Sequence, residues 1–322
     1  MSSRRSSGNV PELVERARGG DARAVARLIS LVEDASPLLR EVMAGLAPYA
    51  GRAHVVGITG SPGVGKSTST NALVGALRVA DKRVGVLAVD PSSPFSGGAL
   101  LGDRVRMQDH ALDPDVYIRS MASRGHLGGL SWTTPQALRV LDAAGCDVIL
   151  VETVGVGQSE VEIAGLADTT MVLLAPGMGD GIQAAKAGIL EIGDLYVINK
   201  ADRAGADQVR RELRSMLALA DHPEGGWRPP IVKTVASRGD GVDEVVTEID
   251  RHHGWLTDSG ELEHRRVRRA RDEIEAIAVT ALRARWGDVH GRSELDDLAA
   301  AVAAGTSDPY AAADELLETF AD

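Results

Sequence analysis

The chain has 322 residues, of which 44% are hydrophobic and only 3% aromatic. That length allows one large α/β domain with helical additions, or two small domains. The formal net charge of −11 disfavours a general nucleic-acid binder, which needs a basic surface. The single cysteine, Cys146, excludes an internal disulfide framework and a cysteine-based zinc site; its place at the start of an apolar run predicts a small buried residue.

Two further absences bear on where the protein works. No run of about 18 apolar residues appears, so no membrane span is expected. The first residues, MSSRRSSGNVPE, are basic and polar and lack the apolar stretch of a secretory signal. We therefore expect a cytoplasmic protein that binds neither nucleic acid nor membranes.

The spacing of hydrophobic residues changes twice along the chain. From Pro11 to about Ala47, and again after about Asp258, the spacing is that of an α-helix. Between them, short apolar runs alternate with helix-like stretches, and the runs are predicted strands at 54–59, 83–90, 116–120, 146–153, 169–176, 195–200 and 230–236. This pattern predicts an α/β fold with a doubly wound, mostly parallel sheet. We expect a helical extension at 1–50, an α/β domain at 51–256 and a helical segment at 257–322.

The helical segment after 258 has one apolar face. That face carries Val267, Ala270, Ile274, Ile277 and Ala278. The arginine run at 265–271 lies among several carboxylates, so we interpret it as a solvated or dimer-facing side of the helix.

A phosphate-binding loop follows the first predicted strand. Residues 60–67, GSPGVGKS, fit the pattern G-x-x-x-x-G-K-[ST], and a helical pattern follows. Gly63 and Gly65 let backbone N–H groups turn towards phosphate oxygens, and the helix N-terminus adds its positive end. Lys66 is expected to reach the β- and γ-phosphates and Ser67 to ligate Mg²⁺. The predicted phosphate-binding residues are Gly60, Pro62, Gly63, Val64, Gly65, Lys66, Ser67 and Thr68. A mere glycine-rich turn would not need all these pattern positions, so we predict a P-loop NTPase.

The sequence Asn199-Lys200-Ala201-Asp202 fits the N-K-x-D box that selects guanine. The Asp202 carboxylate can accept from the N1–H and N2 amine of guanine, and adenine offers neither donor. Each such charge-assisted hydrogen bond contributes about 1.5–3 kcal/mol. Asn199 is expected to tie the loops together and the Lys200 stem to cover the base. In TVASRGDGV the N–H of Ala236 is expected to contact O6, so the bound nucleotide is predicted to be GTP or GDP.

Three acidic residues are candidate magnesium ligands. Asp90 and Glu152 stand at the ends of predicted strands, and Asp103 lies in the long loop that follows Asp90. The loop at 91–102 and the segment after Gly155 are candidate switches, in which the Gly155 N–H would meet the γ-phosphate. Gln158 is a candidate to orient water, although it does not adjoin Gly155. We therefore expect slow intrinsic hydrolysis that a partner or dimerisation accelerates.

Six long blocks carry a family resemblance. They are GITGSPGVGKST, VLAVDPSSPFSGGALLGDRVRM, IRSMASRGHLGGL, VILVETVGVGQSE, PGMGDGIQAAKAGILEIGD and VINKAD. With them the chain resembles the MeaB/ArgK family of phosphate-loop GTPases, which includes the human MMAA protein. The resemblance implies a homodimeric SIMIBI-class GTPase with a C-terminal dimerisation arm. It also implies a chaperone of adenosylcobalamin-dependent methylmalonyl-CoA mutase that gates cofactor loading, protects the mutase and is stimulated by it.

The resemblance also implies roles for single residues. Ser67, Asp90, Asp103 and Glu152 match the Mg²⁺ environment of the family. Gln183 and Lys186 match switch residues that respond to the mutase. The client stays open among methylmalonyl-, ethylmalonyl- and isobutyryl-CoA mutases.

Three other functions are open at this point. One is a pure binding module without hydrolysis, because the position of the candidate water-orienting Gln is unusual. The family has also been labelled an ATPase or kinase acting on lysine/arginine/ornithine transport proteins, but the guanine box and the missing export signal argue against that. Delivery of a metal such as nickel would need clustered Cys and His, and the chain offers one Cys and one close His pair, His252-His253.

Overall fold

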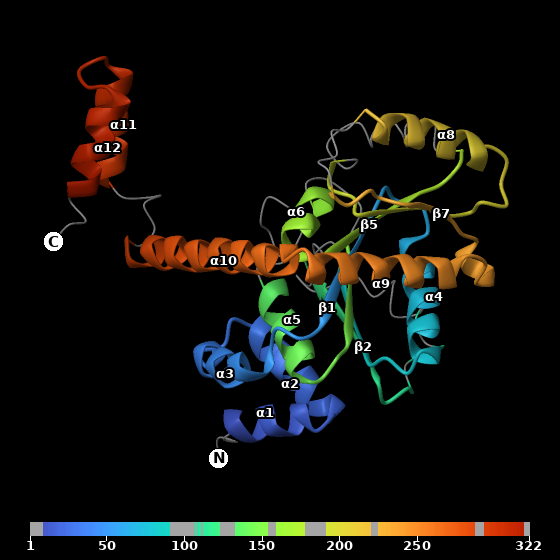
Figure 1. Ribbon diagram of the computed structural model, residues 1–322. Helices are drawn as coiled ribbons and strands as arrows, with labels where there is room; N and C mark the ends of the chain where they lie inside the picture. The colour runs from blue at the N-terminus through green and yellow to red at the C-terminus, as the bar shows by residue number, and fades with distance from the viewer. Residues whose placement is uncertain are drawn as a thin grey trace. The chain divides into compact units, whose positions relative to one another are not determined.

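The computed structural model describes residues 9–90, 107, 109–110, 112–122, 133–153, 159–177, 191–219, 225–286 and 293–318. Seven described strands form one sheet in the order β3-β2-β4-β1-β5-β6-β7, and every neighbouring pair is parallel (Figure 1). The strands are β1 (His54–Thr59), β2 (Val84–Asp90), β3 (Val116–Ala122), β4 (Val148–Glu152), β5 (Thr169–Leu174), β6 (Leu195–Ile198) and β7 (Ile231–Lys233). The predicted α/β fold with a parallel sheet is confirmed.

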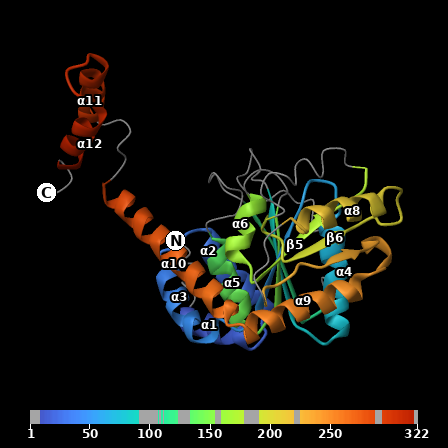
Figure 2. The ribbon, with the colours of Figure 1, turned by 45° about the horizontal axis from the view of Figure 1, so that its top comes forward.

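Helices cover both faces of the sheet, which explains why the strands read as unbroken apolar runs. On one face lie α4 (Lys66–Val79) and α9 (Val242–Asp258) (Figure 2). Their apolar side chains share a buried cluster with those of the strands. On the other face lie α5 (Thr134–Ala143) and α6 (Ser159–Leu166). There α8 (Ala206–Leu217) covers the β5–β6 end through Leu213, which packs on Tyr196. Every residue of β1, β4, β5 and β6 is buried.

The N-terminal helices extend the second of these clusters. They are α1 (Val10–Arg18), α2 (Ala22–Glu33) and α3 (Leu39–Leu46), followed by the short 3₁₀ helix η1 (Ala47–Tyr49). Leu28, Val32 and Leu46 are fully buried in the same cluster as Leu141 of α5. Cys146 is 3% exposed and belongs to it too, which confirms the expected buried cysteine.

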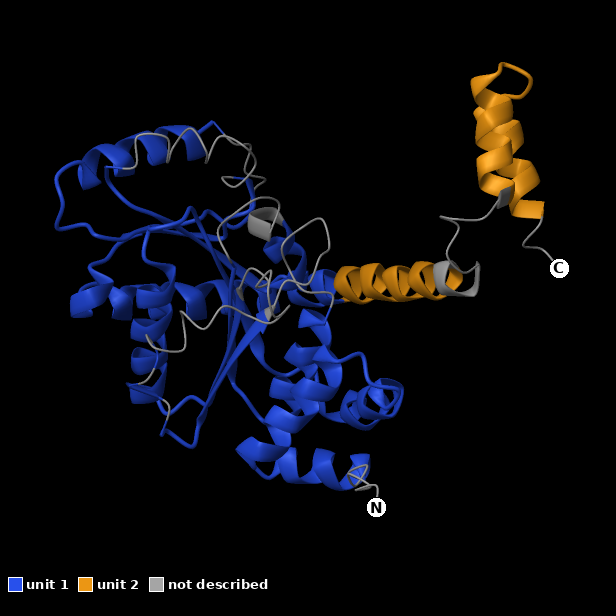
Figure 3. Cartoon of the chain, turned by 180° about the vertical axis from the view of Figure 1, so that it is seen from behind, with its two compact units in different colours: residues 1–266 blue, residues 267–322 orange. Residues whose placement is uncertain are grey.

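Contacts divide the chain into two compact units, 1–266 and 267–322 (Figure 3). The second unit holds most of α10 (Glu261–Trp286), together with α11 (Ser293–Ala303) and α12 (Pro309–Glu318). The expected boundaries after residues 50 and 256 stay a prediction. Within the described ranges, no helix has the length and apolar content that crossing a bilayer requires.

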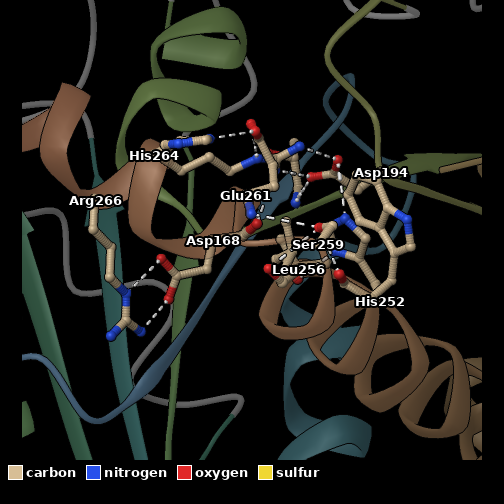
Figure 4. Close-up of polar contacts among 12 residues, drawn as sticks. Asp168, Asp194, His252, Leu256, Ser259, Glu261, His264 and Arg266 are labelled. Atoms are coloured by element: carbon tan, nitrogen blue, oxygen red, sulfur yellow. Dashed lines mark hydrogen bonds and ion pairs between the residues drawn. The ribbon is translucent and has the colours of Figure 1, made fainter. Parts of the chain in front are cut away.

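The start of α10 is bound to the amino ends of the strands by two arginines, which we call the arginine clamp (Arg265 and Arg266). The two terminal guanidinium nitrogens of Arg265 each lie 3.0 Å from an oxygen of Asp194, the residue just before β6. Arg266 donates to Asp168 at 3.0 Å, just before β5, and to the Ala53 carbonyl at 2.9 Å (Figure 4).

The expected solvated or dimer-facing position of the arginine run is therefore wrong for these two residues. Each side chain of the arginine clamp is only 24% exposed, and each pairs with a buried carboxylate. The local sequence pattern does not indicate these ion pairs, because the partner carboxylates are 71 and 98 positions away along the chain. Arg268 and Arg271 are exposed, as predicted.

A chain of buried side chains lies beside the arginine clamp. The Thr169 hydroxyl is 2.7 Å from Nε2 of His54 and 2.8 Å from Nδ1 of His252. Nε2 of His252 lies 3.4 Å from the Asp194 carboxylate. Burial, followed by the effect of His253 stacked on it, lowers the pKa of His54 to about 3. Burial also lowers the pKa of His252 to about 4, against the opposing effect of Asp194.

Candidate functional site

The phosphate loop joins the end of β1 to the start of α4, at the carboxyl edge of the sheet. Gly65 precedes the first residue of α4 with a left-handed φ of +99°. A Cβ at Gly65 would lie 2.5 Å from Nδ2 of Asn199, so both the backbone and the packing require glycine there. The Lys66 ammonium donates to the carbonyls of Gly60 at 2.7 Å and Ser61 at 3.3 Å. The loop therefore curls around the lysine.

The predicted phosphate-binding residues differ in their exposure to solvent. Pro62, Gly63 and Thr68 are exposed, whereas Val64 is 1% exposed. Lys66 and Ser67 are 7% and 6% exposed at the N-terminus of α4, where helix N–H groups have no intrahelical partner. Anions bind favourably at such an end. The predicted phosphate-binding residues thus run from the loop into the first turn of α4, an arrangement suited to that task, and their contact with phosphate stays a prediction.

A buried carboxylate faces the first turn of α4. Glu152 ends β4, the strand beside β1, and is 4% exposed. Ser67 Oγ donates to Oε1 of Glu152 at 2.7 Å, and Thr70 Oγ1 lies 2.9 Å from its Oε2. The structure thus brings together two of the four predicted magnesium ligands, both with the oxygen donors that Mg²⁺ prefers.

The other two predicted magnesium ligands are less fully defined. Asp90 ends β2, whose Ala88 pairs with Glu152, so its backbone extends two positions further towards the same edge. The Asp90 side chain and the whole of Asp103 lie outside the described residues. Among the described residues, no group of three His, Cys, Asp or Glu side chains could hold a metal ion.

Asn199 ties the phosphate loop to the two predicted guanine loops. Its Nδ2 donates to the Val64 carbonyl at 2.9 Å. Its Oδ1 accepts from the Ala236 N–H at 3.1 Å and from the Thr234 hydroxyl at 3.2 Å. With Asn199 3% exposed, this is a buried bridge of three hydrogen bonds. The bridge agrees with the role expected for Asn199; contact of the Ala236 N–H with O6 stays a prediction.

Lys200 and Asp202 complete this side of the site. Lys200 has a left-handed φ of +56° and donates from Nζ to the Gly63 carbonyl at 2.6 Å. Its stem therefore spans from the guanine box to the phosphate loop. The Asp202 side chain is 44% exposed and lies 3.9 Å from Arg238, which pairs more closely with Asp240 at 2.9 Å. The Asp202 carboxylate is thus accessible for an additional partner.

The structure adds residues that sequence reasoning missed. Thr70 contacts Glu152, Thr234 supports Asn199, and Arg238 lies beside Asp202. Thr70 is three positions beyond Ser67, the spacing of one helix face, and this was the available signal. Of the predicted catalytic and switch residues, Lys66 is described above. The other four lie outside the described residues: Gly155, Gln158, Gln183 and Lys186.

The chain is similar to known proteins over most of its length. The family described as methylmalonyl-CoA mutase-associated GTPase MeaB matches residues 25–288. The chain is 48% identical over 311 residues to a candidate GTPase of Pyrococcus abyssi, with 96% of each protein covered. It is 41% identical over 214 residues to the mitochondrial methylmalonic aciduria type A homolog of Mus musculus, covering 66% of this chain and 52% of that protein.

A solved structure has a similar fold. The crystal structure of an LAO/AO transport system kinase matches with a TM-score of 0.77 and 28% sequence identity, and the match covers 98% of this chain and 99% of that one. The family match covers most of the chain, and the sequence holds both a phosphate loop and a guanine box. The chain therefore belongs to the MeaB family of GTPases, enzymes that hydrolyse GTP.

Proposed function

We propose that this GTPase is a chaperone of an adenosylcobalamin-dependent acyl-CoA mutase, with methylmalonyl-CoA mutase as the first candidate client. It would gate cofactor loading into the mutase and protect it. The family match over residues 25–288 carries this proposal, since that family is described as mutase-associated. The name of the mouse relative, a methylmalonic aciduria protein, supports it.

The phosphate half of the site supplies charge and hydrogen-bond donors. Lys66, at the N-terminus of α4, would neutralise charge on the β- and γ-phosphates, and the backbone N–H groups of the loop would hold their oxygens. Ser67 and Glu152, whose oxygens already meet at 2.7 Å, fit Mg²⁺ and would hold it with Asp90 and Asp103. Bound Mg²⁺ would offset the negative charge that develops on the transferred phosphoryl group.

The guanine half of the site supplies selectivity. The buried bridge made by Asn199 fixes the guanine box against the phosphate loop, so base and phosphates are read by one rigid assembly. Asp202 would accept from two guanine donors at the exposed edge of that assembly. The bound nucleotide would then be GTP before hydrolysis and GDP after it.

Regulation would come from other residues. Gly155, Gln158, Gln183 and Lys186 would form the switches that respond to the γ-phosphate and to the mutase. Because Gln158 does not adjoin Gly155, the isolated protein would turn over slowly, and the partner would complete the site. A high turnover number for the isolated protein would contradict this part of the proposal.

A homodimer is supported by the apolar face of α10. Val267, Ile274 and Ile277 are 49%, 67% and 43% exposed at spacings of seven and three residues. That spacing is typical of a helix seam that packs on another helix. We propose that the segment after residue 256 is a dimerisation arm. Light scattering after size exclusion should give twice the 33.8 kDa chain mass; a monomer at micromolar concentration would contradict it.

The client is tested by measuring GTP turnover with and without a purified adenosylcobalamin-dependent mutase from the same organism. We expect acceleration by the mutase and co-elution of the two proteins. Lack of both would refute the client assignment and leave the GTPase activity standing.

The competing function is phosphoryl transfer to a lysine/arginine/ornithine transport protein, which the name of the structural relative raises. Incubation with γ-labelled GTP and each candidate acceptor separates the two. Label released as free phosphate supports the chaperone proposal, whereas label on the transport protein supports the kinase.

A further inference from the structure

We propose that Thr70 is a positioning residue for magnesium, which holds the Glu152 carboxylate in the orientation that the ion requires. This inference rests on the proposed GTP–Mg²⁺ site and extends it to a residue that does not touch the nucleotide or the ion. Its evidence is the pair of hydroxyls that α4 presents to one carboxylate.

Glu152 is contacted at both of its oxygens from α4. Ser67 Oγ lies 2.7 Å from Oε1, and Thr70 Oγ1 lies 2.9 Å from Oε2. Residues three apart lie on one helix face, so a single rigid helix fixes the two hydroxyls relative to each other. Thr70 is 0% exposed and Glu152 is 4% exposed, so water does not compete for these contacts.

The two hydroxyls would not do the same work once Mg²⁺ binds. Ser67 would turn its lone pairs to the ion, and its hydrogen would no longer point at the carboxylate oxygen that shares that ion. Thr70 contacts the other oxygen, so its donation to Oε2 would persist and keep Oε1 aimed at the ion. Partners that orient a metal ligand in this way typically change metal affinity by about 10- to 100-fold when they are removed.

A simpler role for Thr70 is that of a helix residue satisfied by its own backbone. Its hydroxyl also lies 3.0 Å from the Lys66 carbonyl, the usual bond of a helical threonine to the preceding turn. The single hydroxyl proton can serve either acceptor. In the simpler role, removing the hydroxyl would lower stability and leave the magnesium requirement unchanged, and this difference makes the two roles separable.

Thr70→Val removes the hydroxyl and keeps the shape, and Thr70→Ser keeps the hydroxyl. Ser69→Ala is the matched control, because Ser69 is 6% exposed on the same helix and its Oγ has no hydrogen-bond partner within the described part of the chain. Should the valine variant fail to fold, Thr70→Ala carries the same comparison with Thr70→Ser. Thermal unfolding without nucleotide checks the fold of each variant.

Two readouts are needed: the Mg²⁺ concentration that gives half-maximal GTP turnover, and the slowing by Mg²⁺ of the release of fluorescent GDP. For Thr70→Val we expect the half-maximal Mg²⁺ concentration to rise about tenfold or more, with GDP affinity in EDTA unchanged. Thr70→Ser and Ser69→Ala should behave like the wild type. An unchanged Mg²⁺ requirement in a folded Thr70→Val would overturn the inference. A wild type that binds GDP without any effect of Mg²⁺ would instead overturn the proposed magnesium site.

Discussion

Replacing Asp202 by Asn tests the guanine assignment most directly. The side chain is 44% exposed, so we take the lower value of about 1.5 kcal/mol for each of the two charge-assisted hydrogen bonds, or about 3 kcal/mol in all. The asparagine oxygen retains one neutral bond of about 1 kcal/mol. The net loss of about 2 kcal/mol corresponds to an affinity about 30-fold weaker.

The same substitution should admit another base. The asparagine amide can donate to the C2 carbonyl of xanthine, where guanine has an amine. Displacement of fluorescent GDP by GTP, XTP and ATP measures all three affinities. We expect GTP to weaken about 30-fold, XTP to tighten, and ATP to stay weak.

Stability provides the internal control for this experiment. The 3.9 Å contact of Asp202 with Arg238 joins two side chains that are 44% and 57% exposed, and such a pair contributes at most about 1 kcal/mol. The variant should therefore unfold close to the wild-type temperature. Asp240→Asn, which alters the closer partner of Arg238, should leave nucleotide selectivity unchanged. If Asp202→Asn keeps its GTP affinity, or if the wild type hydrolyses ATP as well as GTP, the guanine assignment is wrong.

Three further changes test other parts of the structure. Gly65→Ala adds a Cβ 2.5 Å from Asn199 at a residue whose backbone is left-handed, so it should weaken GDP binding more than about tenfold in a titration with fluorescent GDP. Gly305 also has a left-handed backbone but has open space around it, so Gly305→Ala should leave GDP binding unchanged in the same titration. Asn199→Asp replaces a buried donor by an acceptor and should lower the unfolding free energy by about 1–3 kcal/mol in urea titrations; wild-type stability would show that the bridge is not needed. Burial lowers the pKa of His54 to about 3 and of His252 to about 4, so only their unfolded forms take up protons just below pH 6.5. The unfolding free energy should thus be constant above about pH 7 and fall towards pH 4, by up to about 1.4 kcal/mol per pH unit for each histidine. An unfolding free energy that does not change with pH would contradict this. So would a pH dependence that is as steep in His252→Gln as in the wild type.

The sheet and the nucleotide loops were predictable because their signals are local. A strand buried on both faces reads as an apolar run such as HVVGIT, and the phosphate loop and guanine box are short patterns at fixed spacing. Expected strand bounds such as 54–59 and 116–120 agree with β1 and β3 to within two residues. The two loops face each other because parallel strands present their carboxyl ends at one edge.

The unpredicted features depend on contacts between distant parts of the chain. Thr70 reads as an ordinary buried helix residue until the fold places Glu152, 82 positions further on, against it. The arginine clamp reads as part of a charged helix, because the pattern around Arg266 carries no sign of Asp168, 98 positions earlier. Such residue pairs are determined by the order of the strands in the sheet. The local sequence pattern restricts the possible strand orders but does not specify one.

The arginine clamp decides where this protein can be shortened. A GTPase fragment ending at residue 256, where the expected domain ends, would lack both arginines and leave Asp168 and Asp194 without their guanidinium partners. Each lost charge-assisted bond is worth about 1.5–3 kcal/mol, of which water entering the cut surface restores only a part. A fragment ending at residue 266 retains both pairs and the whole first compact unit. The smallest self-sufficient GTPase is therefore longer than its nucleotide-binding motifs suggest, because it must include the start of α10, which holds the amino ends of its strands.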